Sequence, residues 1–370
     1  MRLDADDFLS FDAVEKMVHV LEENPGTALV FPDYFEVDEY GDKIRQIQRH
    51  NFDKDVTLLD QPAHGACTMF LLSVLVEVGG YDENFNRQDG YDIWLAIAHK
   101  YSIKNINIPL FYYRKHANSL TKKESILYKT RGEIIEKHVN KRFKTKLNVL
   151  CVIPVRGEHY DSRSFPLSRL GDKYLIDWTI QSALSCEQIS KIIISTPDLK
   201  LNDYIDKTYD SKVMCLKRNT LLAKINLNLT STITNILGTA IDHDYIPDAI
   251  LILNADFPFR NEIYIRKAIN VLQLYNLNSV IGVRCDDDFF YRHDGNGLKE
   301  LYGCDTLRLE RNDLYRKTGG ITLVKYDYYL KHNKIHDDYS GHVILDKKAA
   351  IKIDSQFDLE LANSIINIEP

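Results

Sequence analysis

Short apolar runs alternate with helix-like segments along the second half of the chain, and this alternation limits the folds open to it. Apolar residues recur at helical spacing in 174–185 and in 260–275. Between and around these segments lie apolar runs rich in β-branched residues, at 147–154, 191–196, 248–254, 279–283, 320–324 and 349–353. Strands that are apolar throughout are typical of a sheet covered by helices on both faces. We therefore predict an α/β domain with a doubly wound, mostly parallel sheet.

The first part of the chain mixes strands and helices on a smaller scale. Ser10 is placed to cap a helix that runs to about Glu23. Residues 27–31 have the composition of a strand, and residues 71–78 have a helical pattern that Gly79 stops. This part is therefore also expected to combine strands with helices.

A charged segment separates the two parts. Its apolar residues recur at helical spacing, and it is rich in Lys, Arg and Glu. We predict a first domain over 1–122, a helical basic linker over 123–146 and a second domain over 147–370. The length of 370 residues agrees with two domains rather than one.

Charge and cysteine usage exclude several classes of protein. The 47 basic and 53 acidic residues give a net charge of −6, which argues against general nucleic-acid binding. The six cysteines form no C-x-x-C pair, as expected for reduced thiols in the cytoplasm. The acidic start MRLDADDFLS is unlike a signal peptide. No apolar run approaches the roughly 18 residues of a membrane span, so we expect a cytoplasmic protein.

Two aspartates follow predicted strands of the second domain. Asp256 comes after the run 248–254, and Asp354 comes after the run 349–353. Ligands of open α/β sheets bind beyond the carboxyl ends of the strands. Mg²⁺ on a triphosphate takes one or two protein carboxylates, so the pair indicates a metal site. The alternative is that each aspartate only caps the helix that follows it.

The loop after the first strand of this domain, 153–176, is rich in cations and glycine. Such a loop can bind phosphate through its cations and its backbone N–H groups. The alternative is a solvated polar loop, because no Walker-type phosphate-binding pattern is present. The residues concerned are Arg156, Gly157, Arg163, Arg169, Gly171 and Lys173.

Six segments of the second domain follow one another as in a known enzyme family. They are IPVRG, LGDKYLIDWTIQSAL, KIIISTPD, LILNADFPFR, KTGGITLVKYDYYL and IDSQFDLELA, between about residues 148 and 367. This series resembles the bacterial cytidylyltransferases that make CMP-activated acidic sugars, including CMP-sialate and CMP-Kdo synthetases. The resemblance covers nearly the whole domain, so it implies the fold more firmly than the activity.

The resemblance implies a reaction and a set of residue roles. Asp256 and Asp354 would hold Mg²⁺, and Arg156 would contact the phosphates of CTP, with Arg163 as a second catalytic cation. Gly157, Arg169 and Lys173 would complete the nucleotide site. The anomeric hydroxyl of an acidic sugar would attack the α-phosphate and release pyrophosphate. Related cytidylyltransferases are often homodimers, and their products serve lipopolysaccharide or capsule assembly.

Two features of the second domain bear on these roles. Phe165 stands where the family loop usually carries a lysine, for which Arg163 or Arg169 is a candidate replacement, and Glu158 replaces a small residue near the phosphates. A later segment, 291–320, is rich in arginine, which suits recognition of a sugar carboxylate. The alternative for each of these arginines is a charged surface position; they are Arg292, Arg308, Arg311 and Arg316.

The first residues of the chain carry a second acidic motif. RLDADD places Asp4 and Asp6 in a D-x-D arrangement, which can bind a divalent metal on a nucleotide diphosphate. The alternative is a solvated cap before a helix. Further motifs follow in VGGYDENFNRQDGYDIWLAIAHK and PLFYYRKHANS.

Together these motifs resemble the family-2 glycosyltransferases of the GT-A fold. By that resemblance, Asp4 and Asp6 would bind Mg²⁺ or Mn²⁺, and Asp89 or Asp92 would be the general base. Arg114 and His116 match the closing motif, which would contact the metal or the diphosphate. Gln88 stands where Glu is usual, and Gly90 lengthens the motif.

The family's nucleotide-binding half, which precedes the D-x-D motif, has no counterpart in this sequence. We therefore expect a partial glycosyltransferase domain, or a gene whose start lies upstream. Three hypotheses follow. The chain is a CMP-sugar synthetase joined to a glycosyltransferase remnant, or a catalytically weak sugar-nucleotide-binding or scaffold protein, or a glycosyltransferase that another chain completes. The first is the leading one.

Overall fold

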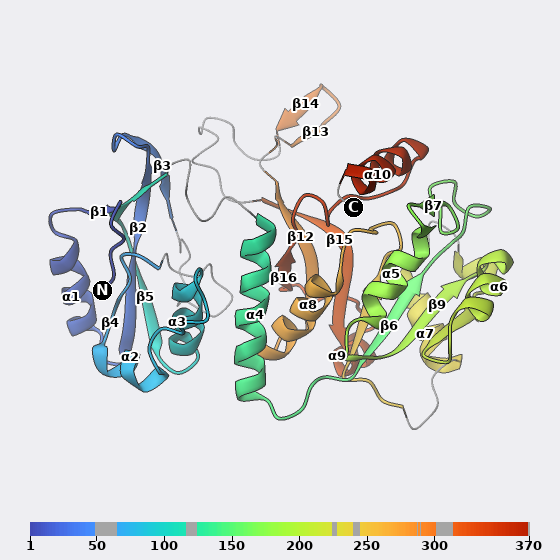
Figure 1. The fold of residues 1–370 in the computed structure, drawn as a ribbon, viewed down its shortest axis with the longest axis horizontal. Coiled ribbons are helices and arrows are strands. Elements are labelled where there is room, and N and C mark those ends of the chain that lie inside the picture. Colours follow the sequence, from blue (N-terminus) through green and yellow to red (C-terminus); the bar gives the residue numbers. More distant parts are fainter. Residues whose placement is uncertain are drawn as a thin grey trace. The chain divides into compact units, whose positions relative to one another are not determined.

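The computed structural model of the chain describes residues 1–48, 65–115, 124–223, 228–239, 245–286, 288, 290–300 and 314–368. Two compact units make up the chain (Figure 1). The first unit comprises Met1–His138 with Asp286–Leu314, and the second comprises Val139–Cys285 with Tyr315–Pro370. This is a division by contacts within the chain. The division by sequence motif, at 122 and 146, stays a prediction.

The first unit holds a small sheet with helices around it. Its sheet has the strand order β1-β5-β2-β3, with β4 also paired to β2, and β13 and β14 form a separate two-stranded hairpin. The elements are β1 (Phe8–Leu9), α1 (Ala13–Glu23), β2 (Thr27–Val37), β3 (Lys43–Ile47), β4 (Met69–Phe70), α2 (Leu72–Val78), α3 (Asp89–Ala98), β5 (Ser102–Arg114), α4 (Glu124–Arg142), β13 (Tyr291–His293) and β14 (Leu298–Glu300).

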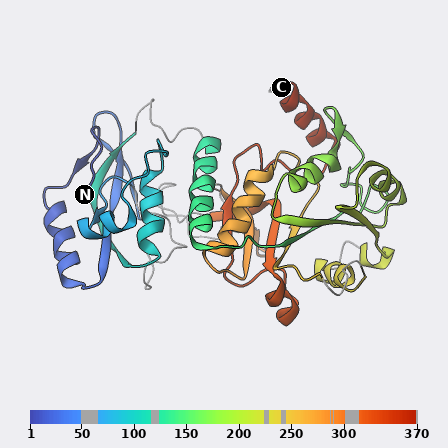
Figure 2. The same cartoon turned by 60° about the horizontal axis from the view of Figure 1, so that its bottom comes forward.

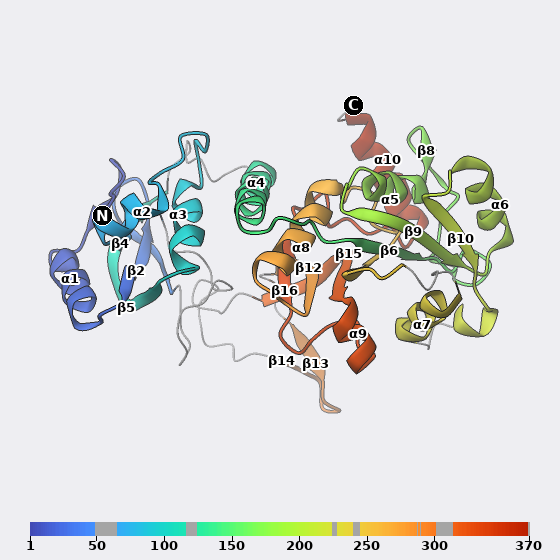
Figure 3. The ribbon, with the colours of Figure 1, turned by 90° about the horizontal axis from the view of Figure 1, so that it is seen from below.

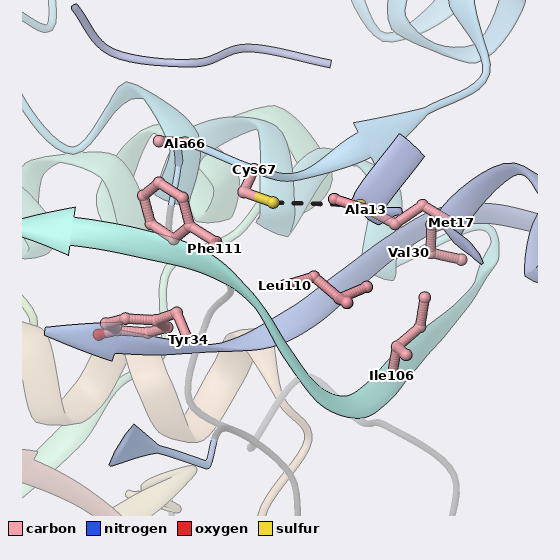
Figure 4. Packing of buried hydrophobic residues seen from close by; sticks show 9 residues of the cluster. All are labelled: Ala13, Met17, Val30, Tyr34, Ala66, Cys67, Ile106, Leu110 and Phe111. Carbon is pink, nitrogen blue, oxygen red and sulfur yellow. Dashed lines mark hydrogen bonds between the residues drawn. The ribbon is translucent and has the colours of Figure 1, made fainter. Parts of the chain in front are cut away.

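Helices α1 and α3 lie on opposite faces of this sheet, as Figure 2 shows. Ala13 and Met17 are one helical turn apart on α1, and both are fully buried in a cluster with Val30 of β2 (Figure 4). The next residue of β2, Phe31, points to the other face and packs edge-on against Trp94 of α3, with ring centroids 5.4 Å apart. The two-residue period of β2 thus provides the apolar contacts for both helices.

Helix α4 confirms the helical part of the predicted linker. Buried residues on one side of it, Ile134 and Ile135, show that the helix packs and is not a solvated spacer. Lys137 and His138 of α4 both bind the carboxylate of Asp92 on α3, at 2.7 and 2.8 Å. The first 15 residues of α4 therefore belong to the first unit.

The second unit contains a seven-stranded sheet with the order β10-β9-β6-β11-β15-β12-β16. Its elements are β6 (Val149–Pro154), β7 (Arg169–Leu170), β8 (Lys173–Tyr174), α5 (Leu175–Leu184), β9 (Ile189–Thr196), α6 (Leu199–Thr208), β10 (Val213–Lys217), the 3₁₀ turn η2 (Thr220–Ala223), α7 (Leu229–Thr239), β11 (Ala249–Leu253), α8 (Glu262–Leu274), β12 (Ser279–Asp286), β15 (Leu314–Lys325), α9 (Tyr326–His332), β16 (Gly341–Ile344) and α10 (Gln356–Ile368).

This sheet is mostly parallel, as predicted. Strands β10, β9, β6 and β11 pair in parallel, as do β12 and β16. Strand β15 runs antiparallel to β11. Figure 3 shows α5 and α8 on one face and α7 and α9 on the other, which is the doubly wound arrangement. On the α7–α9 face, alternate residues of the central strands form one apolar cluster: Leu150, Val152, Ile250 and Ile252, with Ile233, Ile236 and Tyr329.

Two expectations about individual elements are wrong. Residues 349–353 form no strand, because a turn satisfies their backbone: Ala350 N–H donates to the Asp346 carbonyl and Ile351 N–H to the Lys348 carbonyl. The sheet position beside β12 is taken by β16, Gly341–Ile344.

The predicted cap of α1 is the second of these. Helix α1 begins at Ala13 with Asp12 in the capping position, and Ser10 instead donates its hydroxyl to the Asp12 carboxylate at 3.0 Å.

Candidate active site

Three parallel strands of the second unit end at the same edge of the sheet, and their loops carry charged residues. Arg156 follows β6, Asp198 follows β9 and Asp256 follows β11. Parallel pairing of β6 with both β9 and β11 places these loops side by side. Strand topology therefore gathers residues from distant parts of the chain at this edge.

Asp256 and Asp354 lie together at this edge. The N–H of Ile353 donates to the backbone carbonyl of Asp256 at 2.8 Å, which brings the two segments into contact. The ammonium of Lys352 is 2.6 Å from Asp354 Oδ2 and 3.8 Å from Asp256 Oδ2. Burial raises the pKa of Asp256, and the charge of Lys352 counteracts this effect. The pair thus forms one acidic site with a lysine beside it.

Neither aspartate of the pair caps a helix. Helix α10 is capped by Ser355, whose hydroxyl accepts from the N–H of Asp358 at 3.2 Å and donates to the Asp358 carboxylate at 2.6 Å. Helix α8 is capped by Asn261, whose side chain accepts from the N–H of Ile263. The capping alternative considered for Asp256 and Asp354 is therefore wrong.

Arg260 fixes the loop that carries Asp256. Its guanidinium is fully buried and donates through Nη1 to the carbonyls of Asn254, Gly319 and Gly320, at 3.1 to 3.3 Å. Nη2 donates to Thr179 Oγ1 at 3.1 Å. Burial lowers the pKa of Arg260 to about 10. Arg260 thus ties the end of β11 to β15 by neutral acceptors, without a carboxylate partner.

Glycine is required where β15 passes this loop. Gly320 has φ +57°, and a Cβ there would lie 2.8 Å from Asn254 Cβ and from a ring atom of Phe257. Both the positive φ and the close approach exclude larger residues. The second glycine of the KTGGI segment is therefore needed because the loop that carries Asp256 passes too close for a side chain.

The loop after β6 is organised by Asp161. Arg163 donates from Nε and Nη2 to both carboxylate oxygens of Asp161, at 3.1 and 3.3 Å, and Arg156 donates from Nη1 at 3.4 Å. The hydrogen bond from Arg163 holds the pKa of Asp161 below its usual value. The pKa of Arg163 is raised by Asp161 and, more weakly, by the charge of Asp354.

Gly157 lets this loop turn against the next one. Its φ is +82°, and a Cβ there would lie 2.4 Å from Asp198 Oδ2. Asp198 is itself fixed, because its carboxylate accepts from the N–H of Lys200 at 2.9 Å and caps α6. A larger residue at 157 would have to displace this cap.

Arg218 adds a second guanidinium beside Arg156. It is buried, and it donates from Nη2 to the carbonyl of Val155 at 2.7 Å, while its own N–H donates to the Thr196 carbonyl at 2.8 Å. Burial and the nearby charge of Arg156 lower the pKa of Arg218 to about 10. Two neighbouring cations of which one is buried favour an anion such as phosphate. Sequence reasoning missed Arg218, although its place directly after the strand run VMCLK was a usable signal.

Two other predicted nucleotide residues lie against nearby side chains. Arg169 stacks over the ring of Tyr174, 4.3 Å from its centroid, and Lys173 lies 4.3 Å from the Trp178 ring. Phe165, at the position of the missing lysine, packs against a small apolar cluster that includes Leu170 and Ile353, and that joins this loop to α10. Phe165 therefore contributes packing at the place where the family loop carries a charge.

The predicted sugar-binding arginines lie in two described strands and in a segment outside the described residues. Arg292 is exposed on β13, and Arg316 is exposed on β15. Arg308 and Arg311 lie outside the described residues. The assignment of all four to the sugar carboxylate stays a prediction.

In the first unit, the D-x-D motif contacts the predicted general-base region. Arg2 donates from Nε to Asp4 at 3.0 Å and also forms an ion pair with Asp89. Asp92 is buried and binds Lys137 and His138, whereas Asp89 lies nearer the surface. Of the two candidate bases, Asp89 is therefore the more accessible.

Arg114 holds the end of this motif. It donates from Nε to the carbonyl of Asp6 at 2.9 Å and from Nη1 to the carbonyls of Asp38 and Glu39 at 3.1 and 2.6 Å. Its N–H donates to Asp7 Oδ1 at 2.8 Å. Burial raises the pKa of Asp7 to about 6. His116, the remaining member of the predicted site, lies outside the described residues.

The described part of the chain contains neither a larger cluster of metal-binding side chains nor a helix that could span a membrane. There, His, Cys, Asp and Glu side chains form no group of three or more that could hold a metal ion. A pair of carboxylates remains compatible with Mg²⁺, which completes its shell with phosphate oxygens and water. In the same part of the chain, no helix combines the length and the apolar character needed to cross a membrane.

Comparison with known families agrees with both resemblances. Residues 1–131 match the family model described as glycosyltransferase like family 2. Residues 160–298 match the cytidylyltransferase family model. Each model covers one part of the chain, in the order that the sequence motifs predict, so both predicted resemblances are confirmed.

Curated relatives match the second part. N-acylneuraminate cytidylyltransferase of Escherichia coli O18:K1:H7 is 25% identical over 226 residues, which are 60% of this chain and 52% of the relative. The chain thus spans about half the length of that relative. CMP-N,N'-diacetyllegionaminic acid synthase of Legionella pneumophila is 23% identical over 228 residues, which are 60% of this chain and 97% of the relative.

Among solved structures, 4-diphosphocytidyl-2C-methyl-D-erythritol synthase from Anaerococcus prevotii aligns with a TM-score of 0.46 and 16% identity over 62% of this chain and 99% of that one. The family models and the curated relatives together identify the two parts. The chain combines an N-terminal glycosyltransferase-like family 2 domain with a C-terminal cytidylyltransferase domain.

Proposed function

We propose that the second unit transfers the cytidylyl group of CTP to an acidic sugar of the nonulosonic or Kdo type, giving a CMP-sugar and pyrophosphate. The observation that carries the proposal is the meeting of Asp256 and Asp354 at the carboxyl edge of the sheet, where one backbone hydrogen bond joins their segments. Relatives named for the activation of neuraminic and legionaminic acids support the same reaction.

Cations of the β6 loop, together with the arginine that follows β10, are proposed to bind the triphosphate. Arg156 and the buried Arg218 would hold phosphate oxygens, and Asp161 orients Arg156 and Arg163 toward them. A new bond forms between the anomeric oxygen of the sugar and Pα, the hydroxyl proton passes to water, and the bond from Pα to the bridging oxygen of pyrophosphate breaks. Arginines fixed in this way stabilise the charge that develops on the phosphates.

The two carboxylates are proposed to hold Mg²⁺. When bound there with CTP, the ion would neutralise the phosphates and raise the electrophilicity of Pα. Arg260 acts through the loop rather than on the substrate, since it keeps Asp256 at the edge of the sheet. The acidic sugar needs a cation for its carboxylate, for which Arg316 is the described candidate within the second unit.

The proposed setting follows from the substrates. CTP is a cytoplasmic nucleotide, and CMP-activated acidic sugars serve surface glycans such as lipopolysaccharide or capsule, so we place the reaction in the cytoplasm at that stage of synthesis. We also propose a homodimer, by analogy with related cytidylyltransferases.

Pyrophosphate release tests this function directly. The full chain would be incubated with CTP, Mg²⁺ and one of Kdo, N-acetylneuraminate or a legionaminate, and with each other nucleoside triphosphate as a control. We expect Mg²⁺-dependent pyrophosphate release with CTP and at least one of the acids. If no acid supports turnover but calorimetry shows metal-dependent CTP binding, the scaffold hypothesis replaces the enzyme. If CTP does not bind either, the assignment is wrong.

A second function is proposed for the first unit, glycosyl transfer with Asp89 as the base. The observation that favours it is Arg2, which joins Asp4 of the D-x-D motif to Asp89 and so brings the two motifs together. Hydrolysis of UDP- and CMP-sugars by the full chain with Mg²⁺ or Mn²⁺ tests it. Activity that Asp89→Asn abolishes supports glycosyl transfer, and equal hydrolysis by this variant contradicts it.

A further inference from the structure

A lysine already occupies the acidic pair of the second unit. The Lys352 ammonium lies 2.6 Å from Asp354 Oδ2 and 3.8 Å from Asp256 Oδ2. The ammonium therefore lies beside the same two carboxylate oxygens that would coordinate a divalent cation.

The backbone holds this arrangement in place. Ile353 is fully buried, and its N–H is bound to the carbonyl of Asp256 at 2.8 Å. Its neighbours Lys352 and Asp354 remain partly exposed, with 44% and 41% of their side chains accessible. The carboxylate positions are thus anchored by Ile353, whereas the lysine reaches them through a flexible, solvated chain. Such a side chain can leave without disturbing the loop.

We propose that Lys352 is a tethered competitor of the divalent cation at the Asp256–Asp354 pair. This inference rests on the proposed function, which assigns the metal to that pair. Without nucleotide, the ammonium offsets one of the two negative charges of the pair and lowers its affinity for a metal. CTP brings phosphate oxygens that complete the shell of Mg²⁺, so the metal displaces Lys352 most readily when it arrives with its nucleotide.

The competitor differs from the other cations nearby. Arg163 is bound through two nitrogens to Asp161, so its charge is held within the loop. Arg260 donates to carbonyl oxygens and to a hydroxyl. Lys352 is the described cation whose recorded ion pairs are with the two proposed metal ligands themselves.

Binding of Mn²⁺ tests the proposal without any turnover. The free ion would be followed by electron paramagnetic resonance during titration of the full chain without nucleotide. The variants are Lys352→Gln, which removes the competing charge, Lys352→Arg, which keeps it, and Lys347→Gln, which removes a charge from an exposed neighbour on the same segment. Asp256→Asn reports whether binding occurs at this pair.

We expect Lys352→Gln to bind Mn²⁺ about fivefold more tightly than the wild type, as the loss of a partly exposed ion pair implies. Lys352→Arg and Lys347→Gln should match the wild type. Equal affinities of Lys352→Gln and Lys347→Gln, with binding abolished by Asp256→Asn, would overturn the role of Lys352 alone. Binding that Asp256→Asn leaves unchanged would overturn the metal assignment and the Lys352 proposal together. No binding by any variant, Lys352→Gln included, would overturn the Lys352 proposal alone, because removing the competing charge would then not have opened the site to the metal.

Discussion

Arg114 in the first unit and Arg260 in the second both bind backbone carbonyl groups, but they differ in how deeply they are buried. Each donates to three backbone carbonyls, and each holds a segment that carries predicted metal-binding aspartates. Arg260 is fully buried, whereas Arg114 is half-buried. In the second unit, the segment that carries Asp256 is therefore held by a buried arginine. In the first unit, the segment that carries the D-x-D motif is held by an arginine near the surface.

The largest expected effect is on activity at the more rigid site. Asp256→Asn should lower CMP-sugar formation at least about 100-fold, because it removes one of two carboxylates proposed to hold the metal. Pyrophosphate release would measure it. Asp203→Asn, the same change at an exposed position on α6, is the matched control and should stay within twofold of the wild type. A loss below tenfold for Asp256→Asn would show that the pair is not the metal site.

The two arginines themselves give the next largest effect. Arg260→Met should destabilise the second unit by about 3 kcal/mol, because buried carbonyls lose their donor. Arg114→Met should cost the first unit about 1 kcal/mol, because water replaces the lost bonds. Denaturant unfolding followed by probes in each unit would separate the two transitions. Equal losses would contradict the contrast between a buried and a surface framework.

The stability of the first unit should fall at low pH, because it depends on the charge of a buried carboxylate. Glu36 is buried, which by itself would raise the pKa of its carboxyl group, but Arg45 and Lys115 hold this pKa below the ordinary value of 4.5. The folded state therefore binds fewer protons than the unfolded state, so this stabilisation is present above pH 4.5 and is lost as the pH falls through the lowered pKa.

Glu36→Gln tests that linkage. At neutral pH it should destabilise the first unit by about 1 to 2 kcal/mol, because the ion pairs are lost. The difference from the wild type should shrink as the pH falls below 4.5, in thermal unfolding measured from pH 3 to 7. A difference that stays constant over this range would mean that the charge of Glu36 is not what stabilises the fold.

The smallest expected effect is on stability, and it concerns the residues that precede helices α10 and α1. Ser355 caps α10 through a reciprocal pair with Asp358, whereas Asp12 at the start of α1 makes no side-chain capping bond. Ser355→Ala should cost about 1 kcal/mol, and Asp12→Ala should cost less than Ser355→Ala, because Asp12 makes no capping bond. Thermal unfolding of both variants checks this. A larger loss for Asp12→Ala would show that its pairing with Lys16 matters more than a cap.

Much of the second unit could be predicted because its strands are encoded locally. Apolar, β-branched runs such as 248–254 became buried strands, and helical spacing in 260–275 became α8. The run 349–353 has the same composition but forms a turn, since β16 already pairs with β12. Local composition could not tell these two cases apart, because the competition for a place in the sheet involves distant residues.

The buried arginines were missed for a related reason. No role was predicted for Arg218 or Arg260 from the sequence, because charged side chains are seldom fully buried and composition gives no signal of an interior arginine. They become interior residues only when loops from several strands surround them with carbonyl acceptors. No short window of sequence contains those acceptors.

The sequence by itself determined which chemistry this protein has available: aspartates after strands, an arginine- and glycine-rich loop, and two motif sets in a fixed order. Tertiary structure decided which of these groups meet. Asp256 and Asp354 are nearly 100 residues apart, and a backbone hydrogen bond joins their segments; Lys352 then lies between them. The physical reason is that propensity acts over a few residues, whereas a site depends on strand order and on contacts between distant loops.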